Sequence, residues 1–333
     1  MHDVVSELAA WLHSYGWPVE IVASNDPSIG LSRALGRSAG TSEVLGLSYR
    51  LKRLSPWLVH AFEPTEADAA RMAGVPYVLS VPTVAHAEVS AGPDALRELE
   101  VCLRSARQVI TQSRAAASNL LQTFGVESTV VPDGVDTKRL GAVPIRRGRP
   151  LVVCPTFEID HDDLEMLVDA FVLVASSVDG AQLAIAGPLS SKSHGELVSR
   201  MPERLRSQLL VLEKADRKRV LTMFGRASVT CVPSATGSSG RSVVESLAVG
   251  TPVVCADGGS AAEIIDEEAV VAGAGLRFAA GDVGGCAESL TGVMEQSSSE
   301  GVVERCRSRA YLFDWSFVGP RLVEIYRHSA GAF

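Results

Sequence analysis

Short apolar runs alternate with helix-length segments along this sequence, and this alternation restricts the possible folds more than any other feature. In the second half of the chain the strand-like runs are at residues 151–154, 182–186, 209–212, 228–232, 252–255 and 275–278. Segments with helical periodicity separate them. Parallel neighbouring strands need a crossover connection, usually a helix, so the pattern predicts an α/β fold built on a parallel sheet.

A shorter series of the same kind occupies the first part of the chain. After a predicted helix at 3–15, its strand-like runs are at 19–23, 58–61, 77–80, 108–112 and 126–131. Residues 137–150 separate the two series, with several basic residues and no apolar period. We therefore expect two Rossmann-like domains that face each other across a cleft. The expected boundaries are 1–136, a linker at 137–150, 151–312, and a final helix within 313–333.

Composition limits the functional classes. The chain has 333 residues, of which 46% are hydrophobic, enough for two cores, and a formal net charge of −8, which argues against general nucleic-acid binding. Its six cysteines are scattered singly. Cys154, Cys231 and Cys255 stand in strand-like runs, so we expect them in the core and expect no metal. No apolar run reaches the roughly 18 residues of a spanning helix, and the first residues do not resemble a signal peptide. We expect a cytoplasmic protein.

The candidate ligand site is the stretch 231–265, which contains two glycine-rich loops, each followed by a helix with a glutamate. The candidate residues are Gly237, Ser238, Ser239, Gly240, Arg241, Glu245, Gly258, Gly259 and Glu263. In the first loop, small residues and an arginine at a helix start favour an anion. The carboxylate of Glu245, one turn later, can accept hydrogen bonds from hydroxyl groups. Together the loops predict a phosphorylated, polyhydroxylated ligand such as a sugar nucleotide.

Three longer motifs resemble the family-4 retaining glycosyltransferases of the GT-B fold. They are VVPDGVD at 130–136, the segment 233–265 with VVESLAVGTPVV, and FDWSFVGPRLVEIYR at 313–327. The resemblance covers most of the chain and implies a GT-B-like α/β architecture whose final helix crosses back onto the N-terminal domain. The family begins with a strand and a Gly-Gly loop, whereas this sequence begins with the helix that follows them. We therefore expect an N-terminal domain that lacks the family's first strand.

Members of that family move a sugar from a nucleoside diphosphate sugar to an acceptor, with retention and without a metal or other cofactor. The resemblance implies that Glu245 holds the ribose hydroxyls and that the 237–242 loop lies against the donor sugar and phosphate. Gly258 and Gly259 would let the backbone approach the nucleotide. No catalytic side chain is indicated, and the β-phosphate would accept the proton. The acceptor is left open as a sugar, a lipid or a small molecule, and so are peripheral membrane contact and a partner glycosyltransferase.

The other donor contacts of the family fall on different residue types, which makes the active-site motifs degenerate. Pro82 stands where the family has a histidine, and Gly237 replaces the first of its paired glutamates. The basic pair that grips the diphosphate falls at Thr156 and at His161 or Asp162. These differences support a second hypothesis, a non-catalytic glycosyltransferase-like partner or regulatory protein that keeps the fold.

Three candidates also have structural interpretations. Arg241 either binds phosphate or is a structural cation, although the start of a helix is an unfavourable place for one. Glu263 either contacts the nucleotide or accepts hydrogen bonds within its own loop. His60, at a predicted strand end, either lines the cleft or is a structural histidine whose hydrogen bonds are satisfied.

Overall fold

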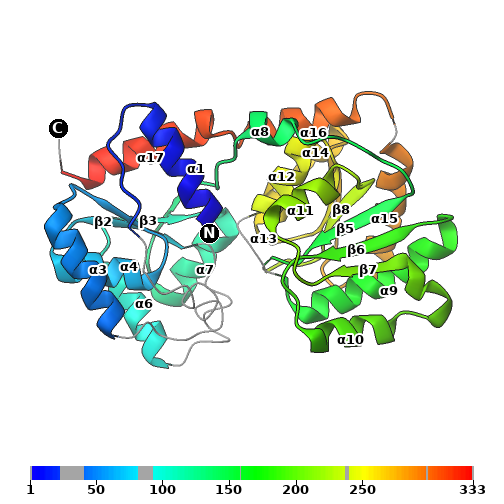
Figure 1. Cartoon of the computed structure of the whole chain (residues 1–333), viewed down its shortest axis with the longest axis horizontal. Coiled ribbons are helices and arrows are strands. Elements are labelled where there is room, and N and C mark those ends of the chain that lie inside the picture. The colour runs from blue at the N-terminus through cyan, green and yellow to red at the C-terminus, as the bar shows by residue number, and fades with distance from the viewer. Residues whose placement is uncertain are drawn as a thin grey trace. The chain divides into compact units, whose positions relative to one another are not determined.

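The computed structural model describes residues 2–22, 41–81, 93–157, 159–236, 240–297 and 299–331. The chain divides into two compact units. Unit 1 consists of Met1–Gly134 and Trp315–Phe333, and unit 2 is Val135–Asp314. Each unit is an α/β structure with its own parallel sheet, as the sequence predicts (Figure 1).

Unit 1 has a four-stranded parallel sheet in the order β1-β2-β3-β4. Its elements are α1 (His2–Ser14), α3 (Thr41–Leu54), β1 (Val59–Ala61), α4 (Pro64–Ala73), β2 (Tyr77–Val81), α6 (Pro93–Ser105), β3 (Gln108–Thr111), α7 (Arg114–Phe124), β4 (Thr129–Val130) and α17 (Trp315–Ser329). The prediction of a strand at 19–23 is wrong for residues 19–22, the part that the structure describes, because these residues pair with no other strand. Val19 and Ile21 are exposed there, and a strand without a neighbour leaves its backbone groups unpaired.

The two faces of the sheet in unit 1 carry different helices, because successive side chains of a strand point to opposite sides. Tyr77 and Leu79 of β2 belong to the core that includes α3, α4 and α6. Val78, between them, packs with α1 and α17. The last helix of the chain therefore completes the core of the first unit (Figure 1).

Glycines permit the close contacts of α17. A Cβ added to Gly134, in the VVPDGVD motif, would lie less than 3.0 Å from the Trp315 indole. A Cβ on Gly319, within α17, would lie equally close to the indole of Trp11 in α1. Real Cβ contacts are longer than this, so both positions need a residue without a side chain.

Unit 2 has a six-stranded parallel sheet in the order β10-β9-β8-β5-β6-β7. Its elements are α8 (Thr137–Gly141), β5 (Leu151–Pro155), α9 (His161–Ser177), β6 (Gln182–Ala186), α10 (Ser191–Arg200), the 3-10 helix η1 (Glu203–Gln208), β7 (Leu209–Leu212), α11 (Arg217–Phe224), β8 (Val229–Val232), α12 (Arg241–Val249), β9 (Val253–Ala256), α13 (Gly259–Ile264), α14 (Glu267–Val271), β10 (Gly275–Phe278), α15 (Val283–Gln296) and α16 (Val302–Tyr311). Helices α9, α10 and α15 pack on one face, and α11, α12 and α16 pack on the other (Figure 1).

The segment 137–150, predicted as the linker, packs within unit 2. It begins with α8, whose Leu140 belongs to the same core as α12 and α16. The Arg147 guanidinium donates hydrogen bonds to three carbonyl oxygens, those of Ala227 at 3.1 Å, Ser297 at 2.7 Å and Gly250 at 2.7 Å. A segment without apolar periodicity can therefore be fixed to a domain by hydrogen bonds from an arginine to backbone carbonyls. A hydrophobic pattern does not predict such contacts.

Candidate functional site

The sheet of unit 2 changes direction between β5 and β8. From β5 the chain adds β6 and β7 on one side, and from β8 it adds β9 and β10 on the other. In open parallel sheets, ligands bind in the crevice outside the carboxyl ends of the strands at such a point. The segments that leave β5 and β8 here are the 156–160 loop and the 233–240 loop, and the second is the glycine-rich loop of the prediction.

Left-handed backbone conformations shape the two glycine-rich loops. Gly240 immediately precedes α12 with φ +72°, and Gly258 and Gly259 at the start of α13 have φ +104° and +66°. Side chains are unfavourable at such values, so glycine is needed. A Cβ on Gly240 would also lie less than 3.0 Å from Ile264 of α13, so the two loops pack closely. Gly237, Ser238 and Ser239 lie outside the described residues.

Glu245 is held by two arginines. Its side chain is only 2% exposed, and its Oε1 accepts a hydrogen bond from Nε of Arg241 at 3.0 Å and from Nε of Arg217 at 2.8 Å. A terminal nitrogen of Arg217 is also paired with Oε1. Arg241 is 6% exposed, so most of this cluster is removed from water. The arginine beside the loop thus contacts the glutamate one turn later, as α-helical spacing allows.

Arg217 was not among the residues that sequence reasoning selected. It begins α11, after β7, and reaches Glu245 across 28 positions of the chain. Its guanidinium also lies over the ring of Phe157, 5.9 Å from the ring centroid. Phe157 follows β5, so Arg217 joins residues from both sides of the point where the sheet changes direction. No local motif signals this contact, because only the strand order brings these segments together.

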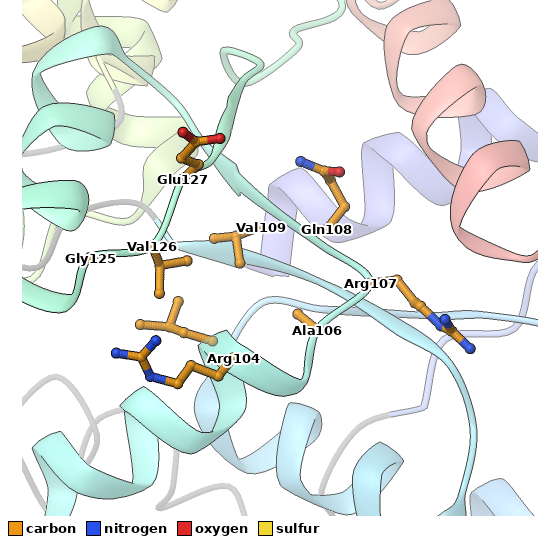
Figure 2. Close-up of a pocket in the computed structure, with 9 residues that line it drawn as sticks. Arg104, Ala106, Arg107, Gln108, Val109, Gly125, Val126 and Glu127 are labelled. Carbon is orange, nitrogen blue, oxygen red and sulfur yellow. The ribbon is translucent and has the colours of Figure 1, made fainter.

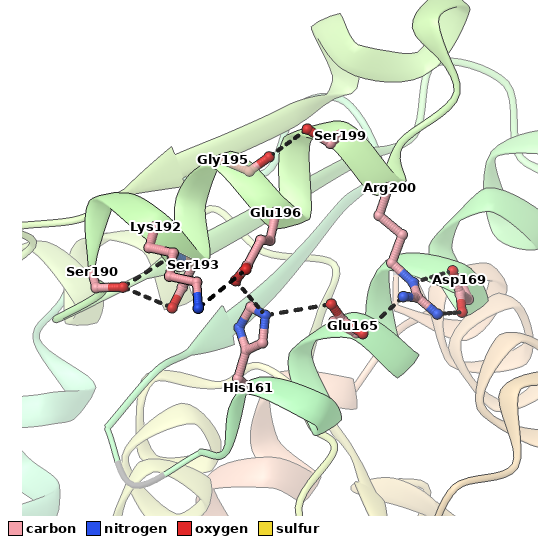
Figure 3. Close-up of polar contacts among 10 residues, drawn as sticks. All are labelled: His161, Glu165, Asp169, Ser190, Lys192, Ser193, Gly195, Glu196, Ser199 and Arg200. Carbon is pink, nitrogen blue, oxygen red and sulfur yellow. Dashed lines mark hydrogen bonds and ion pairs between the residues drawn. The ribbon is translucent and has the colours of Figure 1, made fainter.

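The two positions that correspond to the family's basic pair hold no arginine or lysine. Thr156 is buried and donates its hydroxyl to the carbonyl oxygen of Pro188 at 2.9 Å. Nε2 of His161 lies 3.4 Å from a carboxylate oxygen of Glu165 and 3.0 Å from one of Glu196, and Figure 3 shows the ring between these side chains. At the start of α9, the position of the family's second basic residue is therefore occupied by an imidazole that lies between two carboxylates.

The first turn of α9 also carries the carboxyl groups of Asp162 and Asp163. Burial raises the pKa of the Asp163 carboxyl group, and a hydrogen bond with Ser234 acts in the opposite direction. Ser234 follows β8, whereas Asp163 is in the first turn of α9 after β5. The carboxyl group therefore bridges the two segments that border the crevice.

The remaining two predicted site residues have different surroundings. Glu263 is partly buried in α13, beside the second loop. His60 belongs to unit 1, where Nδ1 lies 2.6 Å from the hydroxyl of Tyr326 and Nε2 lies 2.8 Å from that of Ser80. Burial lowers the pKa of the His60 imidazole to about 3, so the ring is neutral at physiological pH. Both ring nitrogens have partners within unit 1, and the ring ties α17 to the sheet.

Unit 1 also has a hollow of about 420 Å³ between the segments that lead into β3 and β4 (Figure 2). Residues 103–104, 106–109 and 125–127 line it, including Arg104 and Glu127. These residues precede β3 and β4 or begin β3, so the hollow lies at the amino ends of the strands. Ligands of parallel α/β sheets bind at the opposite edge, and the hollow is therefore not the candidate site.

All six cysteines are buried as free thiols, among them Cys154, Cys231 and Cys255, for which the sequence predicts a place in the core. Burial raises the pKa of the Cys255 and Cys306 thiols to about 12, so they are protonated and unreactive at neutral pH. The described residues contain no group of three or more side chains suited to hold a metal ion. None of the described helices combines the length and the apolar character that crossing a membrane would require.

Comparison with protein families identifies the chain. The model described as "Glycosyl transferases group 1" matches residues 150–312, and the model "Glycosyltransferase Family 4" matches residues 2–139. The two matches are separated by residues 140–149 and together cover most of the chain. The protein is therefore a glycosyltransferase of the GT-B class. Within that class, it belongs to the family-4-like glycosyltransferases, as its motifs predict.

Curated relatives carry related names. The chain is 24% identical to a phosphatidyl-myo-inositol mannosyltransferase from Mycobacterium leprae, covering 97% of this chain and 91% of the relative. It is also 24% identical to the Mycolicibacterium smegmatis protein of the same name, over 66% of this chain and 58% of that protein. A D-inositol 3-phosphate glycosyltransferase from Saccharomonospora viridis is 31% identical over 34% of this chain and 26% of its own length.

Solved structures share the fold. A sucrose-phosphate synthase from Thermosynechococcus elongatus superimposes with a TM-score of 0.77 at 16% identity, covering 97% of this chain and 92% of the other. The Anabaena protein HepE, solved with UDP and glucose, gives a TM-score of 0.69 at 18% identity, with 95% and 88% coverage. These likenesses establish the GT-B-like architecture of two parallel sheets.

Proposed function

We propose that this protein transfers a sugar from a nucleoside diphosphate sugar to an acceptor, with retention and without a metal ion. The observation that carries the proposal is the geometry around Glu245. Glu245 lies in α12, the helix that begins directly after Gly240 at the carboxyl edge of the sheet in unit 2. Gly258 and Gly259 form the neighbouring loop with left-handed backbones. Such a site combines backbone N–H groups for phosphate with a carboxylate for hydroxyl groups.

In the proposed mechanism the Glu245 carboxylate accepts hydrogen bonds from the ribose hydroxyls and fixes the nucleotide. The start of α12 faces the phosphate groups, where the helix dipole and the first N–H groups stabilise negative charge. Charge on the diphosphate increases as its bond to the sugar breaks, so these groups act most strongly in the transition state. The β-phosphate accepts the proton of the acceptor hydroxyl on the same face of the sugar, which is consistent with retention.

The acceptor and partners are proposed from the relatives' names. Both mannosyltransferases and the glycosyltransferase from Saccharomonospora are named for acceptors that contain inositol. Inositol-containing lipids and inositol phosphates are therefore the first acceptors to test. Peripheral contact with a membrane would suit a lipid acceptor, and Tyr49 and Trp57 of unit 1 are 64% and 73% exposed. We propose a cytoplasmic location with no nucleic-acid partner.

A non-catalytic role, as a partner or regulator of another glycosyltransferase, is the second candidate. It is favoured by the two carboxylates beside His161 and by Thr156, whose hydroxyl donates a hydrogen bond to the carbonyl oxygen of Pro188 after β6. Such a protein would keep the nucleotide site or the fold without turnover.

Calorimetric titration of the full-length protein with UDP-, GDP- and other nucleoside diphosphate sugars tests the first proposal. We expect binding to at least one donor and its loss in Glu245→Gln. Glu304→Gln serves as a control, because Glu304 is an exposed residue of α16 in the same unit. Absence of binding at millimolar concentrations of every donor would refute the proposal. Binding without release of nucleoside diphosphate, with any acceptor tested, would favour the non-catalytic role.

A further inference from the structure

A buried glutamine, Gln112, follows β3 in unit 1. It is 8% exposed, and within the part of the chain that the structure describes its Oε1 atom is enclosed and has no hydrogen-bond partner. The polar side chains beside it are satisfied. Nε2 of Gln108 donates to the Thr129 hydroxyl at 2.9 Å, and Oγ of Ser113 accepts a hydrogen bond from the Ala116 N–H at 3.0 Å. Buried polar groups are normally paired, because an unpaired one costs free energy.

Gln112 lies at the edge of the sheet where a ligand is expected. It comes directly after β3 and two residues before α7 begins (Figure 1). The ends of β3 and β4 lie side by side there, since the Val131 N–H donates to the Thr111 carbonyl oxygen at 2.8 Å. Parallel α/β sheets bind their ligands outside the carboxyl ends of their strands. The hollow beside Arg104 is at the other edge, so Gln112 is the better guide to a ligand of unit 1.

The chemistry of a carboxamide suits a hydroxyl group. The amide oxygen accepts hydrogen bonds and the NH2 group donates them, and a hydroxyl group can do both. The amide carries no charge that would attract an anion or a cation. A buried amide also discriminates strongly, because a molecule without the matching hydroxyl leaves the amide unpaired. A molecule with several hydroxyl groups is therefore the ligand class that fits Gln112.

We propose that Gln112 binds a hydroxyl group of the acceptor, and that the acceptor is a polyhydroxylated molecule held at the carboxyl edge of the sheet in unit 1. The inference rests on the proposed function, since it assigns a contact of the acceptor in the same reaction. A neutral amide does not take up the proton of the attacking hydroxyl. Gln112 therefore binds a hydroxyl group next to the reacting one and orients the acceptor.

This role separates stability from activity. Methionine is close to glutamine in shape but has no amide, so Gln112→Met removes the unpaired group and keeps most of the packing. A glutamine that serves only the fold would be missed by unit 1, and its replacement would lower the stability. A glutamine that serves the acceptor can be replaced without loss of stability, and only the use of the acceptor suffers.

The test compares Gln112→Met with the wild type as full-length proteins, and Gln122→Met is the matched control. Gln122 is exposed on α7, and its Nε2 donates to the Ser118 hydroxyl at 3.3 Å. Release of nucleoside diphosphate from the donor that the wild type binds measures transfer. The acceptor probes are myo-inositol, an inositol phosphate and phosphatidylinositol in detergent micelles. Calorimetric titration measures donor affinity, and urea unfolding followed by tryptophan fluorescence measures the stability of unit 1.

We expect Gln112→Met to lower kcat/KM for the acceptor at least about tenfold, the size expected when one hydrogen bond to a buried group is lost. Donor affinity should not change. The urea midpoint should be equal to that of the wild type or higher, because no hydrogen bond of the folded protein is removed. Gln122→Met should match the wild type in transfer and in donor affinity.

Four results would overturn the inference. Equal kcat/KM in Gln112→Met and the wild type would remove Gln112 from the acceptor site. A lower urea midpoint in Gln112→Met, or its failure to fold, would show that the amide serves the fold. Donor binding by the wild type without transfer to any of the probes would leave the donor site of the proposed function intact and refute this acceptor contact. Failure of the wild type to bind any donor would refute the proposed function itself, and the inference with it.

Discussion

Replacing Gly319 by alanine tests how α17 completes unit 1. Gly319 lies within α17, and an added Cβ would come within 3.0 Å of the Trp11 indole of α1. Carbon atoms in contact normally lie about 3.5–4.0 Å apart, so either the ring or the helix must shift. Overpacking of this kind costs about 1–3 kcal/mol, whereas glycine-to-alanine in a helix contributes about 0.5–1 kcal/mol of stability. We expect Gly319→Ala to lower the free energy of unfolding by about 1–2 kcal/mol.

Gly46→Ala is the matched control. Gly46 is also in the interior of a helix of unit 1, α3, but an added Cβ would meet no atom within 4 Å. Only the helix preference remains, so this variant should gain about 0.5–1 kcal/mol. The two substitutions are chemically identical, and the difference between them isolates the contact with Trp11.

Tryptophan fluorescence during urea unfolding reports on unit 1 alone. The chain has 4 tryptophans, and all of them, Trp11, Trp17, Trp57 and Trp315, belong to that unit. The unfolding midpoint should move to lower urea in Gly319→Ala and to higher urea in Gly46→Ala. Shifts of the same sign and size in both variants would refute the packing of α17 on α1.

Three further predictions concern His60, Glu245 and Gly240. Because the folded pKa of His60 is lowered to about 3 from 6.5, the unfolded chain binds a proton that the folded chain excludes. The free energy of unfolding of unit 1 should therefore fall by about 2 kcal/mol as pH falls from about 7 to about 5. Urea unfolding at the two pH values measures this, and the His60→Gln variant should not show the loss. Glu245→Ala should destabilise unit 2 by about 3–5 kcal/mol, since it leaves buried Arg241 without its carboxylate; far-UV circular dichroism would detect this, and a change below about 0.5 kcal/mol would contradict it. Gly240→Ala should destabilise unit 2 more than Gly281→Ala in the same assay, because both glycines have left-handed backbones and only the first would press on a neighbouring helix.

The fold is predictable from the sequence because its signals are local and repeated. Each strand of unit 2 is a short apolar run, and glycines such as Gly240, Gly250 and Gly258 mark the turns where a left-handed backbone is required. The expected strand at 19–23 fails in its described part because a strand also needs a neighbour, and the sequence does not specify one.

The site is predictable only in part. Glu245 and the glycines around it lie in one motif, so spacing alone selects them. Arg217 belongs to another helix and meets Glu245 only through the order of the strands. The partners of His60 show the same limitation, since Tyr326 is 266 positions away. The structural role of His60 depends on hydrogen bonds to Tyr326 and Ser80, which are distant in the sequence and cannot be predicted from a local pattern.

Hydrogen exchange of the full-length protein, with and without the nucleoside diphosphate that it binds, tests the central claim most directly. The claim is that the donor occupies the carboxyl edge of the sheet in unit 2, against α12 and the loop before α13. Amide exchange should slow on ligand addition in residues 240–249 and 258–264, and this effect should be lost in Glu245→Gln. Slowing confined to unit 1, or absent from both segments at saturating ligand, would contradict the account.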